Sequence, residues 1–205
     1  MNLRKLHYFS GIAISIFVGL HLFNHFYSLF GANAHIDLMN NLRLFYRNIL
    51  IETILLLAVL IQIISGISLF TKKRKTVSGF FDKLHIWSGL YLAFFFVLHV
   101  STILYARNLM NLDTNFYFGV AGLNTFPLTL FFVPYYGLAV ISFFSHVAAI
   151  HIKKMKYDLL GLTPKFQSVA ILVSGVVFTV VMFYGLTNGF TGVEIPEELN
   201  EMIGK

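Results

Sequence analysis

The sequence predicts an all-α membrane protein, a bundle of five transmembrane helices. The chain is 57% hydrophobic and 12% charged, about half the charge of a soluble domain. It also contains five apolar stretches of roughly 20 residues, the length that crosses a bilayer. Apolar residues run continuously along each stretch instead of alternating, which favours helices over a barrel. We expect one integral-membrane domain over residues 1–205, with its spans at 7–30, 48–70, 84–106, 128–151 and 167–189.

Local signals support these spans in order. The first follows a short basic N-terminus without a small-residue cleavage site, so we interpret it as a retained helix. Pro127 and Pro134 lie at the start of the fourth, where a missing N–H is tolerated. Thr163 and Pro164 fit the N-cap and first residue of the fifth. The acidic tail 194–201 is typical of a short surface helix or a disordered end.

The basic residues predict the topology. If the N-terminus is cytoplasmic, the inner segments carry eleven basic residues: Arg4, Lys5, Lys72, Lys73, Arg74, Lys75, Lys83, Lys153, Lys154, Lys156 and Lys165. The outer segments carry four: Arg43, Arg47, Arg107 and Lys205. The positive-inside rule then places the N-terminus in the cytoplasm and the C-terminus outside. The net charge of +6 comes from these membrane flanks, so we expect the lipid bilayer, and no nucleic acid, as its partner.

A motif that occurs twice places histidines at matching positions. Residues 5–11 read KLHYFSG and residues 83–89 read KLHIWSG, and a second Leu-His pair follows each copy. His7 and His21 are thus fourteen residues apart, as are His85 and His99. Fourteen residues are about four helical turns, so both imidazoles of a helix point from nearly one face, about 21 Å apart. Two such helices side by side would offer two His–His pairs at two depths, which suits two haems.

His21, His99 and His146 lie within the predicted spans and are the first candidates for haem ligation. Polar groups inside a bilayer are costly and by default indicate a functional site, although a helix–helix hydrogen bond is the other interpretation. His7 and His85, near the inner interface, are further candidates, although solvent or lipid head groups could instead satisfy their hydrogen bonds. The other histidines are expected to be interfacial or in loops: His25, His151 and His35.

Haem suits these donors better than another metal does. The chain has no cysteine, which excludes thiolate sites and covalent haem attachment. Zinc or copper sites need three or four converging donors, often with carboxylates or thiolates. Here the donors come in pairs at separate depths, as the axial positions of haem b require.

The second span carries two further polar residues. Glu52 lies near its outer end, five residues after Arg47. It is either an interfacial carboxylate paired with an arginine or a group that exchanges protons with a quinone site. Gln62 lies deeper and could bond a neighbouring helix, a haem propionate or a quinone carbonyl.

The whole pattern resembles the five-helix cytochrome b membrane anchor of succinate:quinone oxidoreductases, the succinate dehydrogenase and fumarate reductase family. The matching motifs are Gly11 with His21 ten residues later, Ser88-Gly89 with Leu98-His99-Val100, and His146 followed by Thr163-Pro164 and Gln167. The resemblance implies that His21 and His99 are ligands of an outer haem. It implies that His146 is a ligand of an inner one.

The chain departs from this family at the inner haem. The family's second inner ligand aligns with Gln62, which is a poor haem ligand. His7 and His85 stand where the family often has glutamine. Three hypotheses follow: His146 pairs with His85 or His7, His7 pairs with His85, or the inner haem is absent.

The resemblance implies one or two haem b groups and electron transfer with menaquinone or another quinone. Its partners would be a flavoprotein subunit and an iron–sulfur subunit on the cytoplasmic side of a bacterial cytoplasmic membrane, and the dicarboxylate chemistry would belong to those subunits. Two alternatives remain: a stand-alone transmembrane b-type cytochrome or reductase, and a haem-free anchor or assembly protein.

Overall fold

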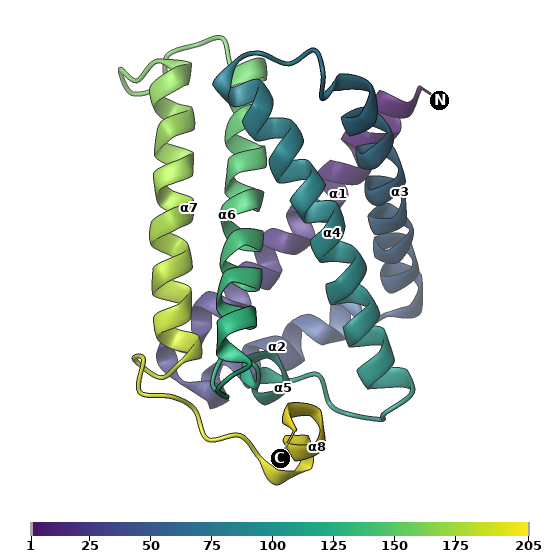
Figure 1. Cartoon of the computed structure of the whole chain (residues 1–205), viewed down its shortest axis with the longest axis vertical. Helices are drawn as coiled ribbons and strands as arrows, with labels where there is room; N and C mark the ends of the chain where they lie inside the picture. The colour runs from purple at the N-terminus through teal and green to yellow at the C-terminus, as the bar shows by residue number, and fades with distance from the viewer. Residues whose placement is uncertain (1, 205) are drawn as a thin grey trace.

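The chain folds into a bundle of long helices joined by short connections (Figure 1). The computed structural model describes residues 2–204, which form no β-strand; Lys205, counted above with the outer charges, lies outside them. The elements in chain order are α1 (Leu3–Phe26), η1 (Tyr27–Phe30), α2 (Ala32–Tyr46), α3 (Ile49–Lys73), α4 (Phe80–Asn108), α5 (Phe116–Val120), α6 (Thr129–Lys154), α7 (Pro164–Leu186), η2 (Glu197–Leu199) and α8 (Asn200–Ile203). Five candidate spans, namely α1 with η1, α3, α4, α6 and α7, confirm the predicted all-α multi-pass membrane fold.

Capping residues set the ends of these helices. The side chain of Asn2 accepts a hydrogen bond from the backbone N–H of Arg4, so α1 begins at Leu3 rather than at residue 7. Thr163 caps α7 and Pro164 is its first residue, as predicted. The fifth span therefore begins and ends three residues before the predicted range 167–189. Pro134 lies inside α6 rather than at its start.

The five spans form a closed ring. Helix α1 packs against α3, α3 against α4, α4 against α6, α6 against α7, and α7 returns to α1. Small residues line the closest contacts, and Ala148 and Ala149 of α6 are fully buried. Helices α1, α4 and α6 carry seven of the eight histidines, so the ring brings these residues to two levels of one bundle.

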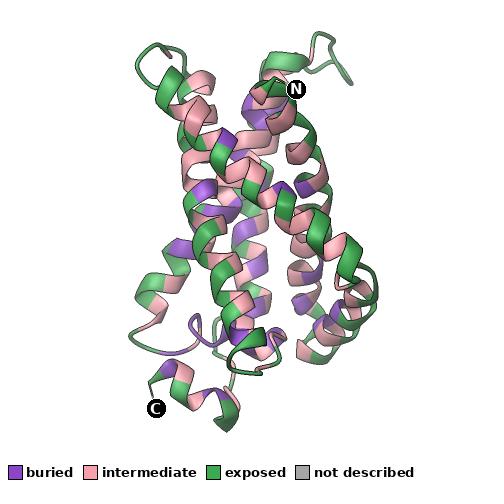
Figure 2. Cartoon of the chain, turned by 90° about the vertical axis from the view of Figure 1, so that its right-hand side faces the viewer, coloured by how far each residue is buried: buried purple, intermediate pink, exposed green. Residues whose placement is uncertain are grey.

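The outer surface of the ring is apolar along its length. Figure 2 shows exposed residues on the outside of the spans from one end to the other. Leu57 of α3 is 53% exposed and Val177 of α7 is 56% exposed. Such large exposed apolar side chains need the hydrocarbon of a bilayer as their surroundings.

The short helices close one end of the ring. A buried cluster joins α5 to the ends of α6 and α7 and includes Phe116, Val120 and Met182. Helix α2 crosses beneath the bundle (Figure 1), and it corrects one prediction: His35 lies in this helix and is 2% exposed, rather than in a loop. The acidic tail ends in the short helices η2 and α8.

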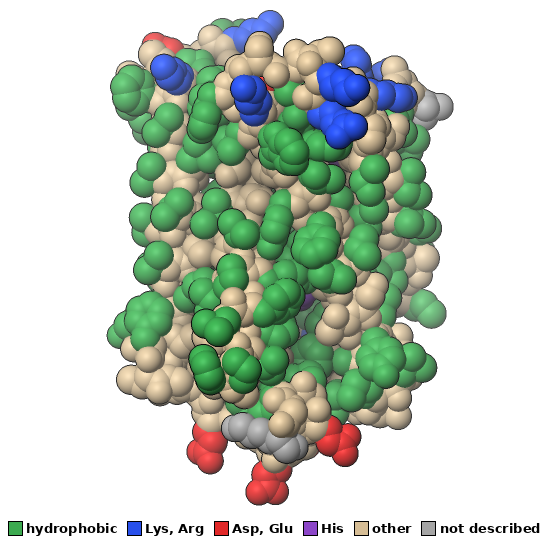
Figure 3. Space-filling view, viewed as in Figure 1, with side chains coloured by type: hydrophobic (Ala, Val, Ile, Leu, Met, Phe, Trp, Pro, Cys, Tyr) green, Lys and Arg blue, Asp and Glu red, His purple; other side chains and the backbone are tan. Residues whose placement is uncertain are grey.

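The two ends of the bundle differ in charge. Figure 3 shows Lys and Arg side chains at one end of the bundle and Asp and Glu side chains at the opposite end; Figure 1 marks the N-terminus at the first end and the C-terminus at the second. We call these the basic end and the acidic end. The connections after α3 and α6 lie at the basic end and hold Arg74, Lys75 and Lys156.

Candidate functional site

Two histidines from opposite sides of the ring face each other near the acidic end. The ring centroids of His21 in α1 and His99 in α4 are 6.1 Å apart. Phe17 stacks on His21 one turn earlier in α1, and Phe95 stacks on His99 in the same way in α4. A first-row metal held about 2 Å from one nitrogen of each imidazole separates such centroids by about 6 Å. The spacing therefore fits one iron atom between the two rings.

His25 and His35 extend this pair into a row of imidazoles. The Nε2 atom of His25 lies 3.1 Å from Nε2 of His21, and its Nδ1 atom lies 3.4 Å from Nε2 of His35. Asn24 Nδ2 bonds His35 Nε2 at 3.1 Å. His25 and His35, which the sequence predicts to be interfacial or in a loop, both belong to this row of imidazoles. An iron ligated by Nε2 of His21 would have to replace the His21–His25 hydrogen bond.

His35 is the one member of this row outside the spans. Burial, with a smaller contribution from electrostatic repulsion by His21 and Arg43, lowers its pKa to about 4. Its Nδ1 atom is buried without a hydrogen-bond partner, as is Oδ1 of Asn24. His35 is therefore a neutral imidazole at pH 7, and the row beneath His21 carries no charge from it.

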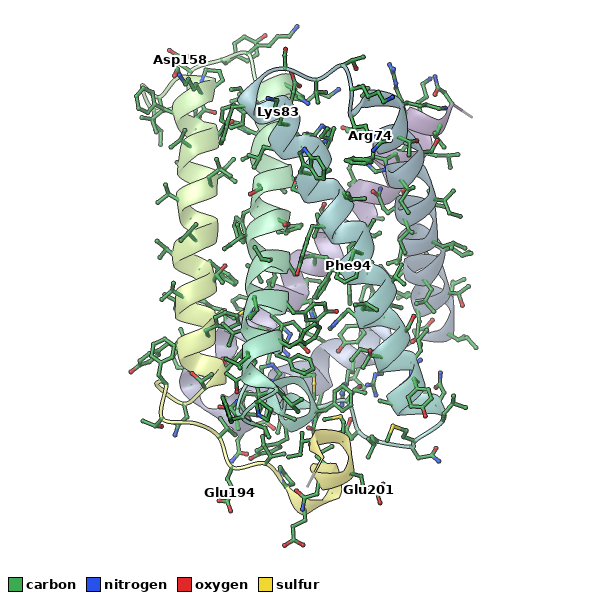
Figure 4. All side chains as sticks on the ribbon, in the orientation of Figure 1. Arg74, Lys83, Phe94, Asp158, Glu194 and Glu201 are labelled. Atoms are coloured by element: carbon green, nitrogen blue, oxygen red, sulfur yellow. The ribbon has the colours of Figure 1, made fainter. Side chains whose placement is uncertain are left out.

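A second group of histidines lies near the basic end. The rings of His85 in α4 and His146 in α6 have centroids 4.4 Å apart. His7 in α1 bonds Ser65 of α3, with 2.8 Å between Nδ1 and Oγ. The structure thus brings His85 against His146, one of the contacts that the sequence left open. Within residues 2–204, His7 and His85 share neither a hydrogen bond nor a ring contact. Figure 4 shows the side chains that fill the space between these helices.

Gln62 and Glu52 both bond protein groups. Gln62 Nε2 donates to the backbone carbonyl of His7 and, at 2.9 Å, to Oγ of Ser10. It therefore joins α3 to α1, the first of its three predicted roles. Glu52 pairs with Arg107 of α4 at 2.6 Å, not with Arg47, because the two helix ends meet while Arg47 turns toward Thr114.

Three of the five arginines gather at the acidic end. Arg43 pairs with the exposed Asp113 at 2.9 Å, and Arg107 pairs with Glu52. Burial lowers the pKa of the third, Arg47, and the positive charges of Arg43 and Arg107 add to this. The cluster holds three guanidinium groups against two carboxylates, and Nε of Arg43 is buried without a partner. It can accept further anionic groups.

This arginine cluster lies beside the outer histidines. Tyr46, between Arg43 and Arg47 in the chain, packs edge-on against Phe17 with centroids 5.5 Å apart. Phe17 in turn stacks on His21 at 5.7 Å. Carboxylates of a ligand held between His21 and His99 would thus find guanidinium groups one aromatic layer away.

Within residues 2–204, no three His, Asp or Glu side chains converge on a point that could hold a bare metal ion. Comparisons with protein-family models, with curated proteins and with solved structures found no match.

Proposed function

We propose that this protein is a haem b-binding membrane anchor. It passes electrons between cytoplasmic flavoprotein and iron–sulfur subunits of a dicarboxylate oxidoreductase and a membrane quinone. The observation that carries the haem assignment is the facing pair His21 and His99, on separate spans and 6.1 Å apart. Haem supplies reversible one-electron chemistry at a potential tuned by its ligands and burial. The partner and quinone assignments are supported by the motifs around Gly11, Ser88-Gly89 and Thr163-Pro164.

The chain's own residues serve this role in defined ways. His21 and His99 would hold the haem iron, and Phe17 and Phe95 stack on the two imidazole rings and fix their planes. The arginine cluster would supply positive charge to the haem propionates. The apolar surface of the spans keeps bulk water away from the site, and such burial favours the neutral form of an imidazole, which is the form that binds iron.

A difference spectrum tests the haem assignment. Protein purified in mild detergent should show the α-band of haem b in a dithionite-reduced minus oxidised spectrum. His21→Ala and His99→Ala should each remove one haem per chain, measured as pyridine haemochrome against protein. His151→Ala is the matched control, because this histidine bonds Gln167 at 2.8 Å and faces neither pair. A colourless, folded wild-type protein would leave the haem-free anchor as the function.

Membrane orientation is part of the same proposal, with the basic end in the cytoplasm. The natural chain has no cysteine, so single-cysteine variants give an unambiguous label. Lys75→Cys, at the basic end, should react with a membrane-impermeant maleimide only in inverted vesicles. Asn188→Cys, after α7, should react in intact cells. The reverse pattern would refute this orientation.

The partners are tested separately. Affinity purification from native membranes under mild detergent should recover two further subunits, one with flavin and one with iron–sulfur clusters. Charge reversal at Lys72, Lys75 and Lys156 should weaken their retention while haem content stays constant. Haem-containing protein recovered without such subunits would support a stand-alone b-type cytochrome.

A further inference from the structure

The hydrogen bonds of the second group of histidines, His7, His85 and His146, distinguish its members by which ring nitrogen is free. A neutral imidazole carries one proton, so the nitrogen that donates a hydrogen bond leaves the other with a lone pair for a metal. Metal-ligating histidines usually donate the second ring N–H to a carbonyl or another acceptor. The partner of each Nδ1 atom therefore decides whether Nε2 can bind iron.

His146 has its Nε2 lone pair free. Its Nδ1 lies 3.1 Å from the backbone carbonyl oxygen of His85 and 3.2 Å from Oγ of Ser88. A carbonyl oxygen only accepts, so Nδ1 of His146 carries the proton and donates it. Gly89 lets the ring lie against α4, since a Cβ there would be 3.0 Å from Cε1 of His146.

His7 has the same arrangement on the other side of the ring of helices. Its Nδ1 lies 2.8 Å from Oγ of Ser65. The Ser65 hydroxyl donates its only proton to the carbonyl of Ile61, at 2.5 Å. Ser65 therefore accepts from Nδ1–H of His7, and Nε2 of His7 keeps a free lone pair. A glycine again stands beside the ring, with Gly66 placing its Cβ position 3.5 Å from Cε1 of His7.

His85 has the opposite arrangement. Its Nδ1 lies 3.0 Å from Nζ of Lys153, which is itself held by Asp82 at 2.8 Å. A lysine ammonium only donates, so Nδ1 of His85 accepts and Nε2 carries the proton. The 4.4 Å between the ring centroids of His85 and His146 is also shorter than the separation of about 6 Å that a shared metal requires.

We propose that His7 of α1 and His146 of α6 are the axial ligands of a second, inner haem, and that His85 is a positioning residue. His85 acts through its backbone carbonyl, which orients His146, and through Lys153, which ties α4 to α6. This inference rests on the proposed function and names the ligands of its second cofactor. It selects one of the pairings that the sequence left open.

Haem stoichiometry in three alanine variants tests the assignment. The wild type should hold two haems per chain, and His7→Ala and His146→Ala should each hold one. His85→Ala should keep two, because its carbonyl remains in place. Low-temperature EPR of the oxidised protein should show that His7→Ala and His146→Ala lose the same low-spin signal. The other signal, from the His21–His99 site, reports that each variant is folded.

Chemical rescue separates ligation from a structural role. His7→Gly should regain the second haem when free imidazole is added, and Ser65→Ala should keep the haem with a shifted midpoint potential. Two haems retained in His7→Ala, or one lost in His85→Ala, would overturn the pairing. A wild type with a single haem that depends only on His21 and His99 would also overturn it while leaving the proposed function intact. A wild type without haem would refute both.

Discussion

The contact between α6 and α7 offers a sharp test of how the bundle is packed. Gly175 of α7 faces Phe144 of α6, and a Cβ atom added at Gly175 would lie 2.4 Å from Cβ of Phe144 and 2.6 Å from its Cγ. Carbon atoms pack at about 3.5–4.0 Å. Since Cβ of Phe144 is attached directly to the backbone, a rotamer change cannot relieve the clash. Gly175→Ala therefore forces the two helices apart by about 1 Å.

The expected cost follows from two opposing effects. Overpacking of this kind costs about 1–3 kcal/mol, whereas alanine is favoured over glycine inside a helix by about 1 kcal/mol. Gly19→Ala in α1 is the matched control, because a Cβ there meets nothing within 4 Å. Both variants share the helix-propensity gain, so the difference between them isolates the clash. Gly175→Ala should be less stable than Gly19→Ala by about 1–3 kcal/mol.

Equilibrium unfolding in mild detergent, followed by circular dichroism, measures this difference. In a Phe144→Ala background, Gly175→Ala should cost less than in the wild type, because the contacts with Cγ and the ring are gone, but it should still cost something, because alanine keeps the Cβ atom at 2.4 Å. The effect should reach the inner site, since α6 carries His146 two residues after Phe144. Equal stability of Gly175→Ala and Gly19→Ala would refute the packing of α6 on α7 described here.

Three further outcomes follow from polar groups. The pKa of His35 falls from 6.5 to about 4 on folding, so as the pH drops the unfolded chain takes up this proton before the folded chain does. The contribution of neutral, buried His35 to stability is complete above pH 6.5 and is lost as the pH falls toward 4. His35→Phe should therefore reduce the loss of unfolding free energy between pH 7 and 4.5 by about 2–3 kcal/mol. Gln167→Leu should lower stability by about 1–3 kcal/mol in thermal unfolding, because it removes the partner of His151 and of two backbone carbonyls while the site stays buried. Glu52→Gln should cost about 0.5–1 kcal/mol by removing the partially exposed partner of Arg107, and a difference from wild type that persists in 1 M NaCl would contradict a simple surface ion pair.

The candidate site divides between what local sequence could predict and what it could not. The fourteen-residue spacing places His21 and His99 at one depth, because helical rise and periodicity are local properties. Their separation of 6.1 Å also depends on how α1 and α4 are rotated in the ring. The i, i+4 spacing of His21 and His25 could have indicated that His25 belongs to the same face. Nothing in the spacing of His35 indicates that α2 carries it beneath the bundle.

The sequence by itself determined the membrane class, the five spans and the depth of the paired histidines, because hydropathy and helical period act over neighbouring residues. The tertiary structure decided which side chains meet. It pairs Glu52 with Arg107 and joins Gln62 to α1. It also places Lys153 within hydrogen-bond distance of His85, and the backbone carbonyl of His85 within hydrogen-bond distance of His146. Such contacts depend on the rotation and crossing of helices that are distant in the chain. That rotation is set by the packing of small and large side chains over the whole ring rather than by any one segment.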